Sequence, residues 1–205
     1  MLKRLLLAAP LCFLSIAANA AEKPAPLYGF ISEVSGGLAL QDVFRPERLK
    51  QDEKNTAALT LEALSTPLFT TTRKSLLWRI LLQPQAHLGG SLSLAGYTSL
   101  LYSGLTWGHQ FSSGAYTRAS FGLALHNGEL NYKDDPALPG LNYIITGRPQ
   151  LGSAVLFREG LEVGYRWQGG HGLGLQISHM SHAGLFDEQN DGMTFLSLRY
   201  SYKFN

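Results

Sequence analysis

The chain has 205 residues, of which 16% are charged and 11% aromatic, with a formal net charge of +2 and one cysteine, Cys12. This length suits one domain, and so small a net charge argues against a general nucleic-acid-binding protein. A single cysteine excludes a disulfide framework and a cysteine-based metal site.

The N-terminal residues 1–20 read MLKRLLLAAPLCFLSIAANA. Lys3 and Arg4 precede a short apolar stretch that ends in Ala18-Asn19-Ala20, which is the order of a secretory signal peptide. The stretch is short for a membrane anchor, the less favoured interpretation. We expect residues 1–20 to be removed on export and residues 21–205 to form a single β-barrel domain.

Beyond residue 20, apolar and polar residues alternate with a period of two, the pattern of strands with one apolar face. In 155–167 the odd positions are apolar apart from Glu159, whereas the even positions include charges and glycine. In 193–204 the even side carries Leu196, Leu198, Tyr200, Tyr202 and Phe204, opposite Ser197, Arg199, Ser201 and Lys203. The pattern predicts strands at 28–42, 55–66, 85–95, 97–111, 114–128, 153–168, 171–182 and 193–204.

Eight strands are typical of the smallest membrane barrels, although a soluble barrel such as a lipocalin shows the same alternation. The export signal favours a membrane barrel. So do glycines and charges on the polar face, which suit a narrow lumen crossed by ion pairs. Aromatic residues near strand ends suit an interfacial girdle: Trp167, Tyr200, Tyr202 and Phe204. We predict an all-β, eight-stranded antiparallel outer-membrane β-barrel.

The predicted connections differ between the two ends of the barrel. One end carries long polar loops, and the other carries tight turns and both chain termini. We take the second end as periplasmic, which places the hairpin at 182–193 beside the outer leaflet of a Gram-negative outer membrane. The segment 67–84 is long for the tight-turn side, and the sequence assigns it no structure.

His179 and Ser181 are two residues apart on a predicted strand and therefore share its apolar face. A histidine beside a serine can act as general base for a serine nucleophile. Such a pair facing lipid suits a lipid substrate, and the alternative is a polar pair at the membrane rim. His179 and His182 point to opposite faces of the strand, so we expect no zinc site. We also expect no cofactor.

Residues 179–194, HMSHAGLFDEQNDGMT, resemble the His-x-Ser-Asn signature of the lipid A 3-O-deacylases (PagL type), also catalogued as acyloxyacyl hydrolases. The resemblance covers most of 97–204. It implies an outer-membrane serine esterase that hydrolyses the ester-linked acyl chain at position 3 of lipid A. Its partners would be lipopolysaccharide and outer-membrane lipid, and a homodimer is compatible with the sequence. The resemblance makes Ser181 the nucleophile, His179 the base and Asn190 an oxyanion-stabilising residue.

Two positions depart from the family pattern. His182 replaces the asparagine expected after the nucleophile, and Thr194 stands where the acid of the triad is expected. We group both with Asn190 as oxyanion or substrate residues. Thr194 shares the parity of Leu196 and Leu198, which predicts an outward position near Ser181. Losing the acid of a triad typically costs on the order of 10⁴-fold in turnover.

Glu159 is our candidate for the missing acid. The Gly169-Gly170 turn predicts antiparallel pairing in which partner numbers sum to about 338 or 340, which places Glu159 opposite His179 or Ser181. A lone carboxylate facing lipid is unfavourable and calls for a partner. The alternative is a glutamate at the headgroup level or paired with a lysine. Three loop carboxylates are further alternatives, as acids or as solvated charges: Asp187, Glu188 and Asp191.

Other functions stay open at this point. A family relative that lost its acid would be a catalytically degenerate structural or lipid-binding barrel. The same scaffold could also carry a different lipid esterase or an acyltransferase.

Overall fold

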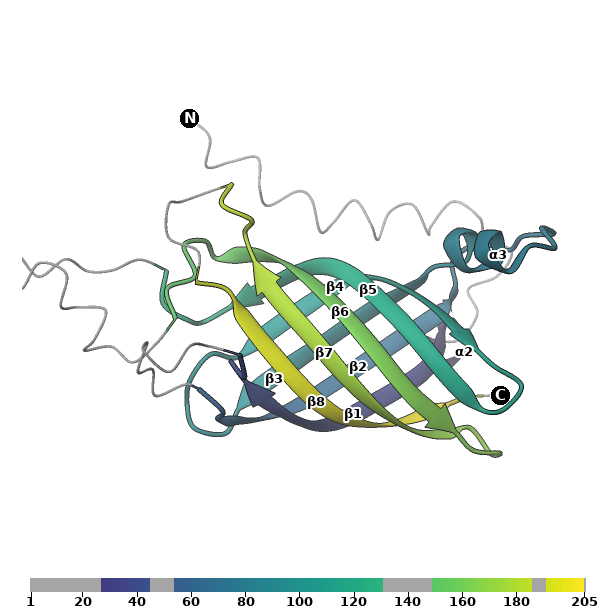
Figure 1. The fold of residues 1–205 in the computed structure, drawn as a ribbon, viewed down its shortest axis with the longest axis horizontal. Coiled ribbons are helices and arrows are strands. Elements are labelled where there is room, and N and C mark those ends of the chain that lie inside the picture. The colour runs from purple at the N-terminus through teal and green to yellow at the C-terminus, as the bar shows by residue number, and fades with distance from the viewer. Residues whose placement is uncertain (1–26, 45–53, 131–148, 186–190, 205) are drawn as a thin grey trace, which may run out of the picture. The chain divides into compact units, whose positions relative to one another are not determined.

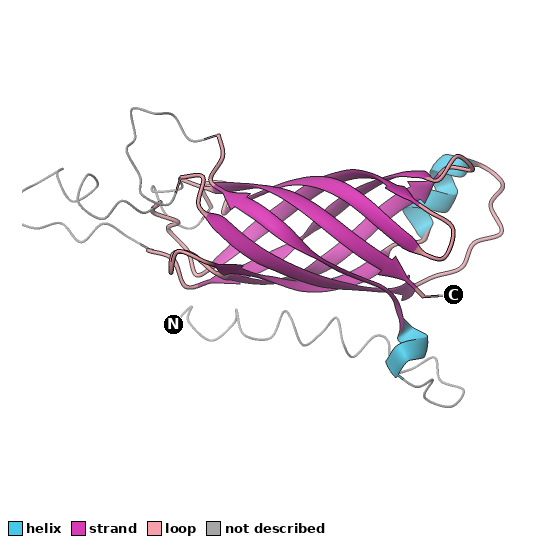
Figure 2. Ribbon diagram, turned by 90° about the horizontal axis from the view of Figure 1, so that it is seen from below, coloured by secondary structure: helices cyan, strands magenta, loops and turns pink. Residues whose placement is uncertain are grey.

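The computed structural model describes residues 27–44, 54–130, 149–185 and 191–204, so the predicted signal peptide lies outside the described residues. Within these ranges, eight strands form a closed antiparallel barrel in which β1 pairs with β8 (Figures 1 and 2). This confirms the predicted fold. The strands are β1 Ile31–Gln41, β2 Ala57–Pro67, β3 Gln85–Ser93, β4 Leu100–Gln110, β5 Ala115–His126, β6 Val155–Arg166, β7 His171–Ser181 and β8 Met193–Lys203.

The observed strand boundaries lie within three residues of the predicted ones, and β1 and β4 show the largest differences. The first strand begins at Ile31 rather than at residue 28, because Leu27–Phe30 form a single helical turn, α2. The connection between β3 and β4 spans residues 94–99, whereas the predicted strands left only residue 96 between them. Gly96 has a φ of +77° there, a conformation that glycine adopts without steric penalty.

The unassigned segment 67–84 contains a second helix, α3 Leu76–Leu82, at the end of the barrel that carries the tight turns (Figure 1). We call this end the short-turn end and the opposite one the long-loop end. The Trp107 indole N–H donates to the carbonyl of Leu81 over 3.3 Å, which ties α3 to β4. Over the described residues, no helix has the length and apolarity needed to span a bilayer.

The two faces of each strand follow the predicted alternation. On β6, Leu161 is 63% exposed on the outside of the barrel, whereas the neighbouring Glu162 is 4% exposed in the lumen. Aromatic side chains lie exposed at the short-turn ends of the strands: Tyr165, Trp167, Tyr200 and Phe204. An apolar outer wall with an aromatic girdle is the surface that an outer-membrane barrel presents to lipid.

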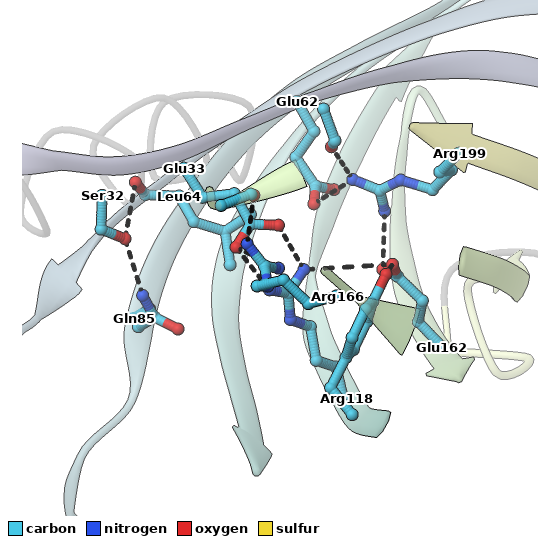
Figure 3. Close-up of polar contacts among 12 residues, drawn as sticks. Ser32, Glu33, Glu62, Leu64, Gln85, Arg118, Glu162, Arg166 and Arg199 are labelled. Carbon is cyan, nitrogen blue, oxygen red and sulfur yellow. Dashed lines mark hydrogen bonds and ion pairs between the residues drawn. The ribbon is translucent and has the colours of Figure 1, made fainter. Parts of the chain in front are cut away.

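Ion pairs between inward-facing side chains cross the lumen (Figure 3). Glu33 accepts from Arg118 over 2.6 Å and 2.8 Å and from Arg166 over 2.8 Å. Arg199 contacts Glu62 at 2.6 Å and Glu162 at 3.3 Å. Because buried charges are stable only when they are paired, this network explains the charged inner faces of the strands.

The lumen changes character toward its long-loop end, where an apolar cluster fills it. The cluster includes Met180 of β7, Met193 and Phe195 of β8, and Leu151 from the connection between β5 and β6. Met180 is 1% exposed and separates His179 from Ser181 in the sequence. The strand that carries these two outward residues is therefore backed by a packed core.

Candidate active site

His179 and Thr194 lie side by side on the outer wall of the barrel. They are directly paired across β7 and β8, and His179 Nδ1 lies 2.9 Å from Thr194 Oγ1. Both side chains are partly exposed. The predicted outward position of Thr194 is confirmed, and its hydroxyl fixes the orientation of the imidazole ring.

Ser181 is the last residue of β7 and is partly exposed two positions beyond His179. No hydrogen bond joins Ser181 to His179 within the described parts of the chain. Both side chains lie on the lipid-facing side of the same strand, so rotation about their χ angles can bring them together. In unliganded enzymes, catalytic hydrogen bonds are often long and tighten only with substrate.

Glu159 on β6 pairs directly with His179. All partners along this ladder sum to 338, as in Phe157 with Ser181, which confirms one of the two predicted registers. Residues directly opposite on antiparallel strands have Cβ atoms about 4.5–5.5 Å apart. His179 thus lies between Thr194 on one neighbouring strand and the exposed carboxylate of Glu159 on the other.

A groove opens on the outer wall beside these three side chains. It has a volume of about 580 Å³. Its apolar lining includes Ala119 of β5, Leu161 of β6 and Ile177 of β7, with Phe44 at the long-loop end. An apolar groove with few polar groups at one place is the usual form of a small-molecule site, and here it faces the lipid.

Gly192 packs against the imidazole of His179 from the hairpin between β7 and β8. A Cβ atom built on Gly192 would lie 2.8 Å from His179 Cε1 and 3.0 Å from Nε2. The preceding residue, Asp191, holds this backbone in place. Its N–H donates to the carbonyl of Gln150 over 3.0 Å, and its carboxylate accepts from the Gln150 N–H over 2.8 Å. The sequence suggested neither contact.

Of the remaining predicted site residues, the structure describes His182 and Asp191. His182 is completely buried, so it is not part of the exposed surface that carries His179, and we assign it no substrate contact. Asn190, Asp187 and Glu188 lie outside the described residues. Asp191 is a structural contact of the hairpin rather than the solvated charge expected of it. Among the described residues, no group of three or more His, Cys, Asp or Glu side chains could hold a metal ion.

Replacing Gly192 by alanine is expected to lower the catalytic activity of this site by about 10- to 100-fold, because the new methyl group displaces the imidazole. The matched control is Gly96→Ala. Gly96 also has a positive φ at the long-loop end, but a methyl group there meets nothing within 4 Å. Activity assays on both variants, with folding checked by heat-modifiable gel migration, measure the difference. Equal losses in the two variants would contradict the role of Gly192.

A comparison with family models matches residues 69–203 to the model described as lipid A 3-O-deacylase (PagL). A search of curated proteins found no match. Among solved structures, the crystal structure of the outer membrane enzyme PagL is similar, with a TM-score of 0.59 and 16% identity. The alignment covers 84% of this chain and all of that one.

Two further barrels show lower similarity. A de novo designed transmembrane β-barrel aligns with a TM-score of 0.48 and 9% identity over 89% of this chain and 98% of its own. The N-terminal β-barrel domain of Pseudomonas aeruginosa OprF gives 0.45 and 12%, over 83% and 98%.

Proposed function

The chain belongs to the lipid A 3-O-deacylase (PagL) family of outer-membrane barrels, and from this membership we propose that it is a serine esterase that removes the 3-O-linked acyl chain of lipid A. Ser181 is the nucleophile and His179 its general base. We include in this proposal that residues 1–20 are the export signal and that the site faces the outer leaflet.

The observation that carries the proposal is the position of the polar cluster on the lipid-facing wall. His179, Thr194 and Glu159 lie together at the edge of an apolar groove, near the long-loop end. A polar cluster facing lipid is unfavourable unless it serves a function. An ester of a membrane lipid can reach this cluster by lateral diffusion while its acyl chain lies along the groove.

Acylation of the enzyme begins with attack of Ser181 Oγ on the ester carbonyl carbon. With its Nδ1–H donating to Thr194 Oγ1, His179 keeps a lone pair on Nε2, which accepts the serine proton. The side chain of Asn190 and backbone N–H groups donate to the oxyanion. When the intermediate collapses, the sugar hydroxyl leaves with the proton from His179, and the acyl chain remains on Ser181.

Deacylation repeats these steps with water. His179 removes a proton from water, the resulting nucleophile attacks the acyl-enzyme, and the fatty acid leaves as Ser181 regains its proton. The imidazole becomes cationic in both half-reactions. Glu159, directly opposite His179, supplies the negative charge that stabilises the imidazolium, a role that a threonine hydroxyl cannot fill.

The experiment that tests this function is expression of the protein in an outer membrane, followed by mass spectrometry of the extracted lipid A. We expect loss of one hydroxyacyl chain and release of the free fatty acid. Unchanged lipid A at a comparable level of folded barrel would overturn the proposal. Transfer of the acyl chain to another lipid would instead identify an acyltransferase.

If the groove holds the acyl chain of the substrate, filling the groove should weaken binding of long acyl chains. Ala119→Trp places a bulky side chain in the lining of the groove, next to Leu161 on the neighbouring strand. Losing contact with two or three methylene groups weakens binding of a long acyl chain by about 2 kcal/mol, or roughly thirtyfold in kcat/KM. Hydrolysis of a short-chain ester is expected to stay unchanged.

Ala63→Trp is the matched control for this prediction, because Ala63 lies on β2, away from the groove. The measurement compares kcat/KM for long-chain and short-chain esters in both variants. An equal loss on both substrates in Ala119→Trp would show that the groove does not hold the acyl chain.

A catalytically degenerate lipid-binding barrel is the second candidate. The observation that favours it is the threonine, rather than a carboxylate, on His179 Nδ1. Binding of lipid A by the purified barrel without loss of any acyl chain would support this candidate.

A further inference from the structure

The segment between β2 and β3 exposes an apolar surface at the short-turn end, away from the site described above. No residue of α3 is buried. Within this segment, Phe69 is 60% exposed, Leu77 61% and Trp78 52%. Exposed apolar patches of this kind mark a surface that binds lipid or protein.

The charges of this segment indicate that its exposed surface binds lipid rather than protein. Residues 67–84 contain three cations, Arg73, Lys74 and Arg79, and the sequence has no aspartate or glutamate from residue 63 to residue 128. All three cations are exposed. Basic side chains beside exposed leucine and tryptophan are typical of segments that lie in the interface of an anionic membrane.

Two hollows lie beside α3, one lined by apolar residues and the other by polar ones. An apolar one of about 300 Å³ is lined by Phe69, Leu81, Leu82 and Pro84, among others. A polar one of about 140 Å³ lies between Arg79 of α3 and the strands β3 and β4, where Gln85 and His109 line it. A phospholipid presents this same combination of an apolar chain and an anionic headgroup.

We propose that residues 67–84 form an interfacial anchor that binds anionic phospholipid in the leaflet at the short-turn end of the barrel. The apolar side chains of α3 insert beside the acyl chains, and Arg73, Lys74 and Arg79 contact the headgroup phosphates. The anchor continues the lipid-facing wall through β4, where Trp107 holds α3 by its hydrogen bond to Leu81. It fixes the depth of the barrel in the membrane.

Site-directed spin labelling of the full mature chain in phospholipid vesicles tests the anchor. The label is placed at Leu77→Cys, with Ser113→Cys in the turn between β4 and β5 as the control at the same end of the barrel. Vesicles of phosphatidylcholine are compared with vesicles that contain about 30% phosphatidylglycerol. We expect the label at position 77 to be accessible to oxygen and protected from a water-soluble nickel quencher. This protection should be stronger in vesicles that contain phosphatidylglycerol. The label at position 113 should be accessible to the nickel quencher in both kinds of vesicle.

A variant with Arg73, Lys74 and Arg79 replaced by glutamine is expected to lose the dependence on phosphatidylglycerol while the barrel still folds. Equal quencher access at Leu77 and Ser113 in both vesicles would overturn the proposal. The proposal would also be overturned if inorganic phosphate, added to phosphatidylcholine vesicles, protected the label at position 77 as strongly as phosphatidylglycerol does. Neither readout depends on deacylation, so the anchor can fail without the proposed function failing.

Discussion

Ser181→Ala is expected to abolish lipid A deacylation, with a fall in kcat of at least about 10³-fold. The hydroxyl is the group that forms the acyl-enzyme, and no other hydroxyl on the outer face of β7 lies next to His179. The measurement is the lipid A mass profile together with release of fatty acid in detergent. The barrel should form as in the wild type, because Ser181 lies outside the lumen cluster.

Ser197→Ala is the matched control, because Ser197 lies on the neighbouring strand β8, is buried on the lumen side and does not line the groove. It should leave deacylation close to the wild-type level. Persistent activity in Ser181→Ala would show that another group attacks the ester. A loss in both variants would point to a general effect on the barrel.

Glu159→Gln is expected to lower kcat about 10²-fold with little change in KM. A carboxylate about 5 Å from the imidazolium contributes about 3 kcal/mol at an effective dielectric constant of about 20, which corresponds to about two orders of magnitude in rate. The charge interacts with the imidazolium of the transition state and not with the neutral base, so its loss affects kcat. Steady-state kinetics of the purified barrel measure both parameters.

Two further variants test whether Glu159 is the carboxylate that stabilises the imidazolium of His179. Glu129→Gln removes a carboxylate near the long-loop end, beyond the end of β5, and should have no effect. Thr194→Glu places a carboxylate on the Nδ1 side of the ring. A large gain in kcat for Thr194→Glu, combined with unchanged kinetics in Glu159→Gln, would mean that the natural protein has no carboxylate partner for His179.

The period of two in the sequence predicted the eight strands and, on β6, β7 and β8, which residues face outward. The Gly169-Gly170 turn limited the register of β6 and β7 to two possibilities, and the structure shows the one that pairs Glu159 with His179. Thr194 could be placed on the outer wall by parity alone. These features depend on local geometry that repeats along each strand.

Other features depend on contacts that leave no periodic signal. The approach of Gly192 to His179 depends on the conformation of a loop, and the Asp191–Gln150 pair joins segments 41 residues apart in sequence. The helix α3 went unassigned because it is too short for helical periodicity to show in a run of leucines.

The groove beside His179 opens sideways, through the wall of the barrel, rather than into the aqueous phase. Enzyme and substrate therefore meet in two dimensions, and turnover should depend on the mole fraction of lipid A within the leaflet rather than on its bulk concentration. Diluting the substrate with inert detergent or phospholipid would then slow the reaction at constant total substrate. The composition of the surrounding leaflet would thus set the rate at which the enzyme works.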